Sequence, residues 1–147
     1  DNSKILKAYK DEVNKFARKI ETDEISVAEY SLYDIDHDGI IELIIKSVTC
    51  EADYTYSIYT YANKLFYIGD ISASHAYLAI DPDGIGIYRS TAHMGFQNVD
   101  RITLKGIKLH EESVMEPTEF PQGQKYIDYE PIPYYNYDDD TGFEIDN

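Results

Sequence analysis

The spacing of hydrophobic positions changes once along the chain, near residue 25. Within residues 1–20, apolar side chains recur at spacings of three, four and seven, which predicts one face of a helix over 3–20. A serine is the expected N-cap, and a polar stretch at 21–23 is the expected end. The apolar positions are Ile5, Leu6, Tyr9, Val13, Phe16, Ala17 and Ile20.

This helix is basic, which leaves two interpretations open. Residues 1–20 contain six bases and three acids, a composition that suits a helix lying on an anionic membrane. Asp11 and Glu12 interrupt the basic face, however. We therefore favour a helix that packs its apolar side on an acidic domain and leaves its lysines in water.

After Ile25 the apolar residues alternate with polar ones, and Tyr, Ile, Val and Thr become frequent. Both features are typical of half-buried strands. Turn signals separate the strands, such as Asp81-Pro82-Asp83-Gly84 and Lys105-Gly106. The predicted strands are 28–34, 40–49, 54–61, 65–71, 75–80, 85–90, 97–104 and 107–114.

Short connections between successive strands predict antiparallel neighbours. The expected fold class is α+β, an N-terminal helix packed on a curved antiparallel β-meander over residues 25–115. We expect residues 1–147 to form a single domain, because this length supports one hydrophobic core. Residues 116–147 form a Pro- and Tyr-rich acidic C-terminal segment, with an expected edge strand at 124–130 and the last ten residues loosely held.

Charge narrows the classes of partner. The net charge is −15, and nucleic-acid binding needs a basic footprint, so we expect no nucleic-acid partner. No apolar run approaches 18 residues, so no membrane span is expected. Cys50 is the only cysteine, and we interpret it as a small buried hydrophobic residue.

The stretch Asp34-Ile35-Asp36-His37-Asp38-Gly39-Ile40-Ile41-Glu42 contains the chemistry of a cation loop. Acids stand at positions 1, 3, 5 and 9 with glycine at position 6, so alternate carboxylates face one hard cation. The predicted ligands in loop 34–42 are Asp34, Asp36, Asp38 and Glu42, with the Ile40 carbonyl. An EF-hand needs Glu at position 12, where this chain has Ile45, and a strand-like run follows the loop. We expect Ca²⁺ in a structural role, with a solvated acidic turn as the alternative.

At these residues the chain resembles a known group. The string YSLYDIDHDGIIELII is similar to the YxLxDIDGDGxPELI segment of uncharacterised exported, lipoprotein-like proteins of Gram-positive gut bacteria. The DxDxDGxxE core also resembles the calcium loops of integrin-type propeller repeats. The chain departs from the group at His37 and Ile41. The resemblance implies an extracellular or cell-surface location after removal of a signal peptide, and it brings no known activity.

Two further sets of residues have candidate functions. Tyr54 and Tyr56 share one face of a predicted strand, and Tyr59 and Tyr61 share the other. These tyrosines suit either packing or an aromatic surface for an extracellular polysaccharide or protein. We expect a non-enzymatic binding or interaction module. The alternative is a hydrolase of a cell-wall or gut polymer that uses His75 or His93 as a base.

Overall fold

The computed structural model describes residues 2–48 and 54–144, so Cys50 lies outside the described residues. The helix begins and ends close to its predicted bounds, at α1 (Ser3–Glu21). The strands also lie close to the predicted ranges. They are β1 (Val27–Tyr33), β2 (Glu42–Val48), β3 (Tyr54–Tyr61), β4 (Leu65–Ser72), β5 (Ala76–Ile80), β6 (Ile87–His93), β7 (Phe96–Lys105), β8 (Lys108–Glu119) and β9 (Tyr135–Asn136), followed by the 3₁₀ helix η1 (Asp140–Glu144).

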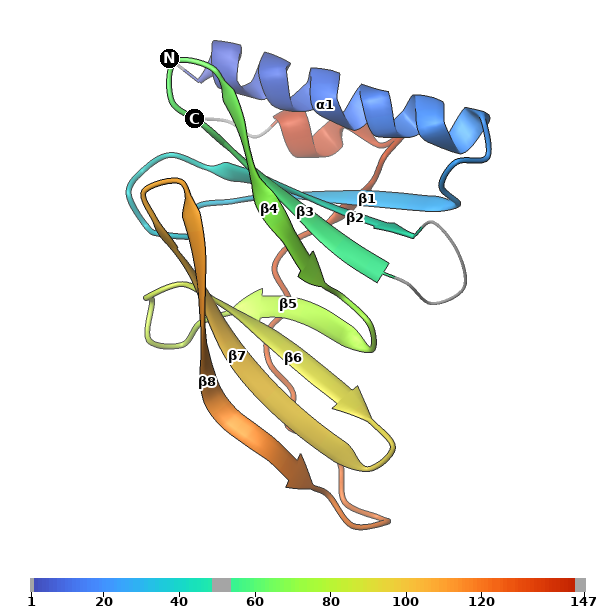
Figure 1. Cartoon of the computed structure of the whole chain (residues 1–147), viewed down its shortest axis with the longest axis vertical. Helices are drawn as coiled ribbons and strands as arrows, with labels where there is room; N and C mark the ends of the chain where they lie inside the picture. The colour runs from blue at the N-terminus through green and yellow to red at the C-terminus, as the bar shows by residue number, and fades with distance from the viewer. Residues whose placement is uncertain (1, 49–53, 145–147) are drawn as a thin grey trace.

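The strands form two antiparallel sheets, so the prediction of one curved meander over 25–115 is wrong. The first sheet has the order β4-β3-β2-β1-β9, and the second has the order β5-β6-β7-β8. Successive strands pair within each sheet, but the ladder stops between β4 and β5. Figure 1 shows α1 along one side of the first sheet and the second sheet on the other side.

Both faces of β2 are buried, so the first sheet needs a covering layer on each side. Six of its seven residues are buried, and only Lys46 is half-buried. Ile44 packs with Ile87 and Ile102 of the second sheet. Leu43 packs on the opposite face with residues of α1. A strand with two buried faces needs a layer on each side.

The helix covers the first sheet through the stripe that its spacing predicts. Tyr9, Val13 and Phe16 are buried against β1 and β2, which bears out the packing interpretation of this helix. The Tyr9 hydroxyl also donates a hydrogen bond to the Ile41 carbonyl at 2.6 Å. This bond ties the middle of the helix to the last residue before β2.

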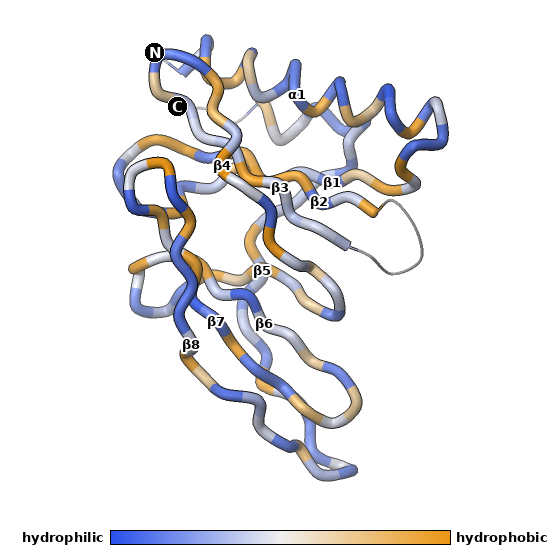
Figure 2. The backbone as a smooth tube through the Cα atoms, in the orientation of Figure 1, coloured by the Kyte–Doolittle hydropathy of each residue, from blue (hydrophilic) through white to orange (hydrophobic). Residues whose placement is uncertain are grey.

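The second sheet ends in the hydrophilic edge strand β8. Most of its residues are exposed, and Figure 2 shows mainly hydrophilic colours along it. Arg89 bonds to Asp100 and Glu111 across β6, β7 and β8. Charged side chains on an edge strand discourage pairing with other chains.

Residues 126–144 connect the two sheets, and we call them the closing segment. No strand forms at 124–130, so the predicted edge strand there is wrong. The backbone instead meets the edge of the second sheet, where Ile80 N–H donates to the Glu130 carbonyl and Ile132 N–H to the Leu78 carbonyl. It then pairs with β1 as β9.

Residues 138–144 are also held in place, contrary to the prediction of a loose end. They include η1, and the ring of Phe143 stacks on Tyr30 with centroids 4.6 Å apart. Tyr30 is buried and donates its hydroxyl hydrogen to the Asp139 carbonyl. Aromatic packing therefore fixes this part of the chain where its composition alone suggested solvation.

Candidate metal centre

The 34–42 loop joins β1 to β2 and gathers carboxylates at the end of that hairpin. Tyr33 and Glu42 are paired across the two strands, so the loop closes directly behind them. Ile35 is fully buried in the core between the sheets and anchors the loop. Gly39 has φ +91°, a backbone conformation that glycine adopts without strain. The acids are therefore held on a fixed turn.

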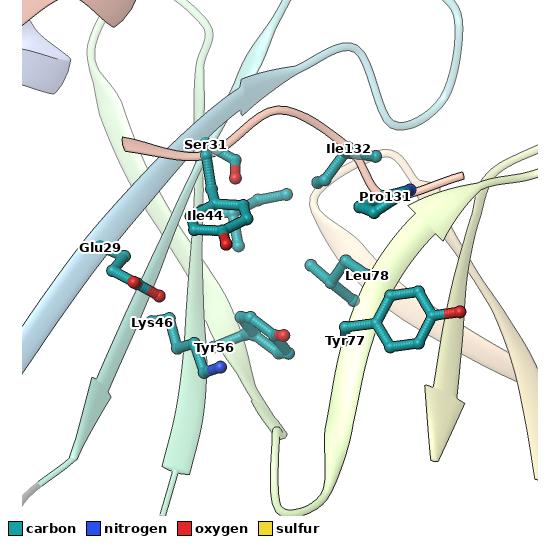
Figure 3. A pocket seen from close by; sticks show the side chains of 10 residues that line it. Glu29, Ser31, Ile44, Lys46, Tyr56, Tyr77, Leu78, Pro131 and Ile132 are labelled. Carbon is teal, nitrogen blue, oxygen red and sulfur yellow. The ribbon is translucent and has the colours of Figure 1, made fainter. Parts of the chain in front are cut away.

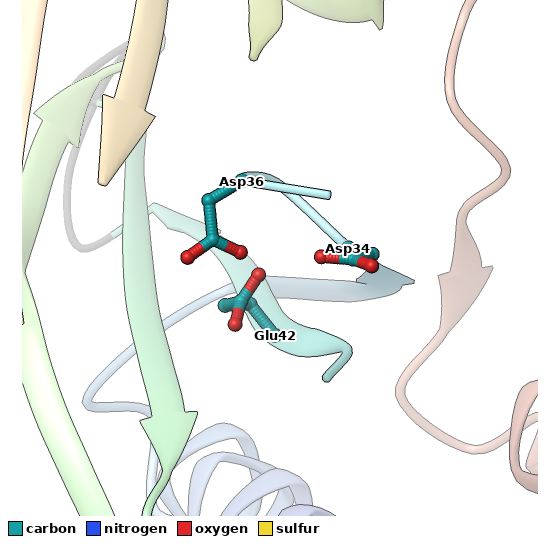
Figure 4. A group of neighbouring side chains, drawn as sticks. All are labelled: Asp34, Asp36 and Glu42. Atoms are coloured by element: carbon teal, nitrogen blue, oxygen red, sulfur yellow. The ribbon is translucent and has the colours of Figure 1, made fainter. Parts of the chain in front are cut away.

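Three of the predicted ligands converge. Asp34, Asp36 and Glu42 each offer a carboxylate oxygen, and these oxygens all lie within 4.8 Å of one another. Figure 4 shows the Asp36 and Asp34 side chains from the loop beside that of Glu42 at the start of β2. Each carboxylate is a hard oxygen ligand of the kind that Ca²⁺ and Mg²⁺ prefer.

Glu42 is held by neighbours that the loop spacing does not reveal. It is 1% exposed, and its Oε1 accepts a hydrogen bond from Ile35 N–H at 2.8 Å. Its Oε2 accepts one from the Thr60 hydroxyl at 3.1 Å. The interruption of the apolar run 40–45 by a single Glu is the sequence signal for this buried acid, but the Thr60 contact depends on the pairing of β2 with β3.

Burial opposes the ionisation of Asp36 and of Glu42. Burial raises the pKa of Asp36 to about 6, with Asp38 and Asp34 adding to the rise. Burial also raises the pKa of Glu42 to about 8; the hydrogen bond from Ile35 opposes the rise and the charge of Asp36 adds to it. A bound cation would reverse this effect, because an opposite charge favours the ionised form.

Asp36 supplies the observation that tests whether a cation fits. Its Oδ1 is buried and has no hydrogen-bond partner among the described residues. A buried acceptor without a donor is costly. Once ionised, the three carboxylates can only accept hydrogen bonds, so a hard cation fits as the missing partner of this oxygen. Calcium suits them because it accepts irregular oxygen cages.

Asp38 is not one of the three converging carboxylates, although its side chain contributes to the raised pKa of Asp36. Asp38 is exposed, and its Oδ1 accepts a hydrogen bond from Ile40 N–H at 2.9 Å. Asp34 accepts hydrogen bonds from Asp38 N–H and Gly39 N–H, so it also shapes the turn. Ligation by Asp38 and by the Ile40 carbonyl stays a prediction.

The four tyrosines of β3 take the two faces that alternation predicts. Tyr54 and Tyr56 pack in the core between the sheets, and Tyr59 and Tyr61 pack on the helix side. Tyr56 is 6% and Tyr59 is 7% exposed. These four therefore serve mainly as packing and do not form an exposed aromatic surface, although Tyr56 also lines a cavity.

His75 and His93 come together as an exposed stacked pair. Their ring centroids lie 3.8 Å apart at the ends of β5 and β6. A catalytic base is normally oriented by a carboxylate and faces a nucleophile or water. Stacking of one imidazole on the other does not supply that arrangement, so the hydrolase alternative gains no support from it.

In the part of the chain that the structure describes, fold and site define a domain of two antiparallel sheets and one α-helix, with an acidic loop at the end of a hairpin. No helix in the described part of the chain is long and apolar enough to cross a membrane. Comparison with family models, curated proteins and solved structures finds no match at any of the three levels.

Proposed function

We propose that this chain is a calcium-stabilised domain in which the cation has a structural role. The carrying observation is the convergence of the Asp34, Asp36 and Glu42 carboxylates, together with the buried Asp36 Oδ1, which has no hydrogen-bond partner among the described residues. A cation there joins the loop to the start of β2. Since Thr60 of β3 also holds Glu42, the cation would stabilise three successive strands of the first sheet.

The proposal places the domain outside the cell. Loops of this kind in extracellular modules bind calcium at about 10⁻⁴–10⁻³ M, a concentration found outside cells. The resemblance of the 30–45 region to exported proteins of Gram-positive bacteria supports the same location. The role is that of a non-enzymatic binding or interaction module, because the described chain presents a fixed cation loop and tyrosine-lined hollows.

Calorimetric titration with calcium chloride tests the site. Protein stripped with a chelator should give a one-site isotherm, and its melting temperature should rise more in calcium than in magnesium. Asp36→Ala should abolish both effects. Asp128→Ala, which removes an exposed aspartate from outside the loop, is the matched control. Absence of heat and of any melting shift at millimolar calcium would overturn the proposal and leave an acidic turn.

A further inference from the structure

A cavity of about 220 Å³ lies between the first sheet and the edge of the second. One wall comes from β1, β2 and β3, and the other from β5 and the closing segment. Figure 3 shows Glu29, Lys46 and Tyr56 on the first wall, facing Leu78, Pro131 and Ile132 on the second. These segments are far apart in the chain, so the fold creates the cavity.

The first wall consists of two rows of side chains, most of them polar. Glu29 of β1 is the direct cross-strand partner of Lys46 of β2, which is in turn the partner of Tyr56 of β3. The next row adds Ser31 beside Ile44. Residues two apart on a strand share a face, so both rows point into the same space. Their hydroxyl, ammonium and carboxylate groups provide both donors and acceptors.

Lys46 and Glu29 form no ion pair with another charged residue in the described part of the chain. Lys46 Nζ lies 5.0 Å from the ring centroid of Tyr54 and 5.9 Å from that of Tyr56, and none of the ion pairs formed there includes either residue. Cation–π contact holds an ammonium in place while leaving its N–H groups free to donate. The wall can therefore still bind polar groups of a ligand.

The second wall is apolar and ends in an aromatic ring. Leu78, Pro131 and Ile132 form its floor, and Ile132 N–H is bonded to the Leu78 carbonyl, which fixes the two segments together. Tyr134 is 63% exposed and stands at the same cavity. An apolar floor with a few convergent polar groups is the usual composition of a small-molecule site.

The charges and the size select a ligand class. One carboxylate and one ammonium cancel within the cavity, while the chain as a whole carries −15, which repels anions. A neutral ligand whose polar groups both donate and accept is therefore favoured over a charged one. The cavity is below the roughly 300–1,000 Å³ of drug-sized pockets, so it suits a single ring.

We propose that this cavity binds one neutral pyranose ring of a glycan, with its hydroxyls on Glu29, Lys46 and Ser31 and its C–H face on the apolar wall and Tyr134. This inference rests on the binding role proposed above and gives it a place and a ligand class. The cavity contains none of the three clustered carboxylates, so sugar binding and calcium binding are separate properties.

The experiment uses methyl glucoside, methyl galactoside, methyl mannoside and N-acetylglucosamine as probes. Each is titrated into ¹⁵N-labelled protein while amide chemical shifts are recorded, once in calcium and once in chelator. At least one pyranoside should shift amides of Glu29, Ser31, Lys46, Leu78 and Ile132 with saturation near a Kd of about 1–10 mM, which is ordinary weak affinity. Calcium should instead shift amides of 34–42, so either result can fail alone.

Two variants and a control separate recognition from general damage. Tyr134→Ala should weaken sugar binding about 2- to 10-fold, the range for loss of one aromatic contact. Lys46→Met keeps most of the length of the side chain and removes its donors, and it should weaken binding at least as much. Tyr67→Ala removes a 58% exposed tyrosine outside this cavity and should change nothing.

Three outcomes would overturn the inference. One is the absence of saturable shifts for every pyranoside up to about 50 mM. Another is a set of shifts that lies elsewhere or survives both variants unchanged. The last is that leucine, a zwitterion with an apolar side chain, binds saturably in the same cavity while no sugar does.

Discussion

The carboxylate of Glu42, a residue that is 1% exposed, accepts a hydrogen bond from the hydroxyl of Thr60 at 3.1 Å. This contact joins the acidic loop to β3. The same carboxylate accepts Ile35 N–H on its other oxygen. A buried acid with two donors is satisfied only in part, because each carboxylate oxygen can accept more than one bond.

Glu42→Gln should abolish the melting shift caused by calcium while the protein still folds. The amide keeps the shape and can accept the bond from Ile35, but it removes a negative ligand. In chelator at pH 8 the variant should be at least as stable as the native chain, because it removes a buried charge. Thermal melts with and without calcium check this. Glu116→Gln on exposed β8 is the matched control, and a variant that keeps the full calcium shift would remove Glu42 from the site.

The stability of the calcium-free protein should fall as pH rises from 5 to 8. The pKa of Glu42 is raised from 4.5 to about 8, and that of Asp36 from 3.8 to about 6. An acid with a raised folded-state pKa stabilises the fold fully below its unfolded pKa, and this contribution is lost as pH rises through the folded value. The loss should amount to about 1–4 kcal/mol.

Urea unfolding in chelator across this pH range measures that loss. Calcium affinity should rise over the same range, because the ligands must lose their protons before they bind. Stability that is flat in chelator from pH 5 to 8, in the native chain and in Glu42→Gln alike, would contradict the assignment of these raised pKa values.

A separate ion pair should govern stability in acid. The Asp81 side chain is fully buried and bonded to Arg101 at 2.7 Å. Burial alone would raise the pKa of Asp81, but the bonds from Arg101 and from Asp83 and Gly86 N–H lower it to about 2. An acid with a lowered pKa stabilises the fold above its unfolded value, and this contribution is lost as pH falls toward 2.

Asp81→Asn should therefore cost roughly 3 kcal/mol at pH 7 and flatten the loss of stability between pH 4 and 2. Asp83→Asn, at a side chain that is 65% exposed on the same arginine, should cost less than about 1 kcal/mol. Denaturant unfolding at pH 7, 4 and 2 compares the three proteins. Equal costs for the two variants would show that burial of Asp81 does not set the strength of this pair.

Gly142→Ala should detach the end of the closing segment. A Cβ at this position would lie 2.7 Å from ring atoms of Tyr30 and Tyr135, which are too close for any side chain. We expect a loss of about 1–3 kcal/mol from this overpacking. Amide exchange of Tyr137, whose N–H donates to the Ala28 carbonyl, should also become faster. If the variant has the same melting temperature and the same amide exchange rates as the native chain, η1 contributes little to the fold.

Periodicity along the chain was enough to locate the helix and each strand from β1 to β8 within a few residues. It could not show that the ladder breaks between β4 and β5, because alternation describes which face is buried and not what covers it. The consecutive apolar residues Leu43, Ile44 and Ile45 were the available signal, since they place apolar side chains on both faces of β2. Three-layer packing follows from that pattern.

The acidic loop shows the same limit at the level of a site. Spacing identified Asp34, Asp36 and Glu42, because the chemistry is local to nine residues. The contacts from Thr60 and Tyr9 depend on strand pairing and helix packing, so no local pattern contains them. The cavity beside Lys46 is harder still, since its walls come from β1, β2 and β3 on one side and from β5 and the closing segment on the other, and no local pattern joins them.

The pairing of β9 with β1 has a consequence for the order in which the chain can fold. Glu29 and Tyr30 meet Asn136 and Tyr135, so the outer edge of β1 stays open until residues more than one hundred positions later have been made. Loops of that length close slowly. During synthesis, the outer edge of β1 would therefore stay unpaired and exposed after the rest of the first sheet has formed. Pairing of Tyr135 and Asn136 with β1 then covers this exposed edge.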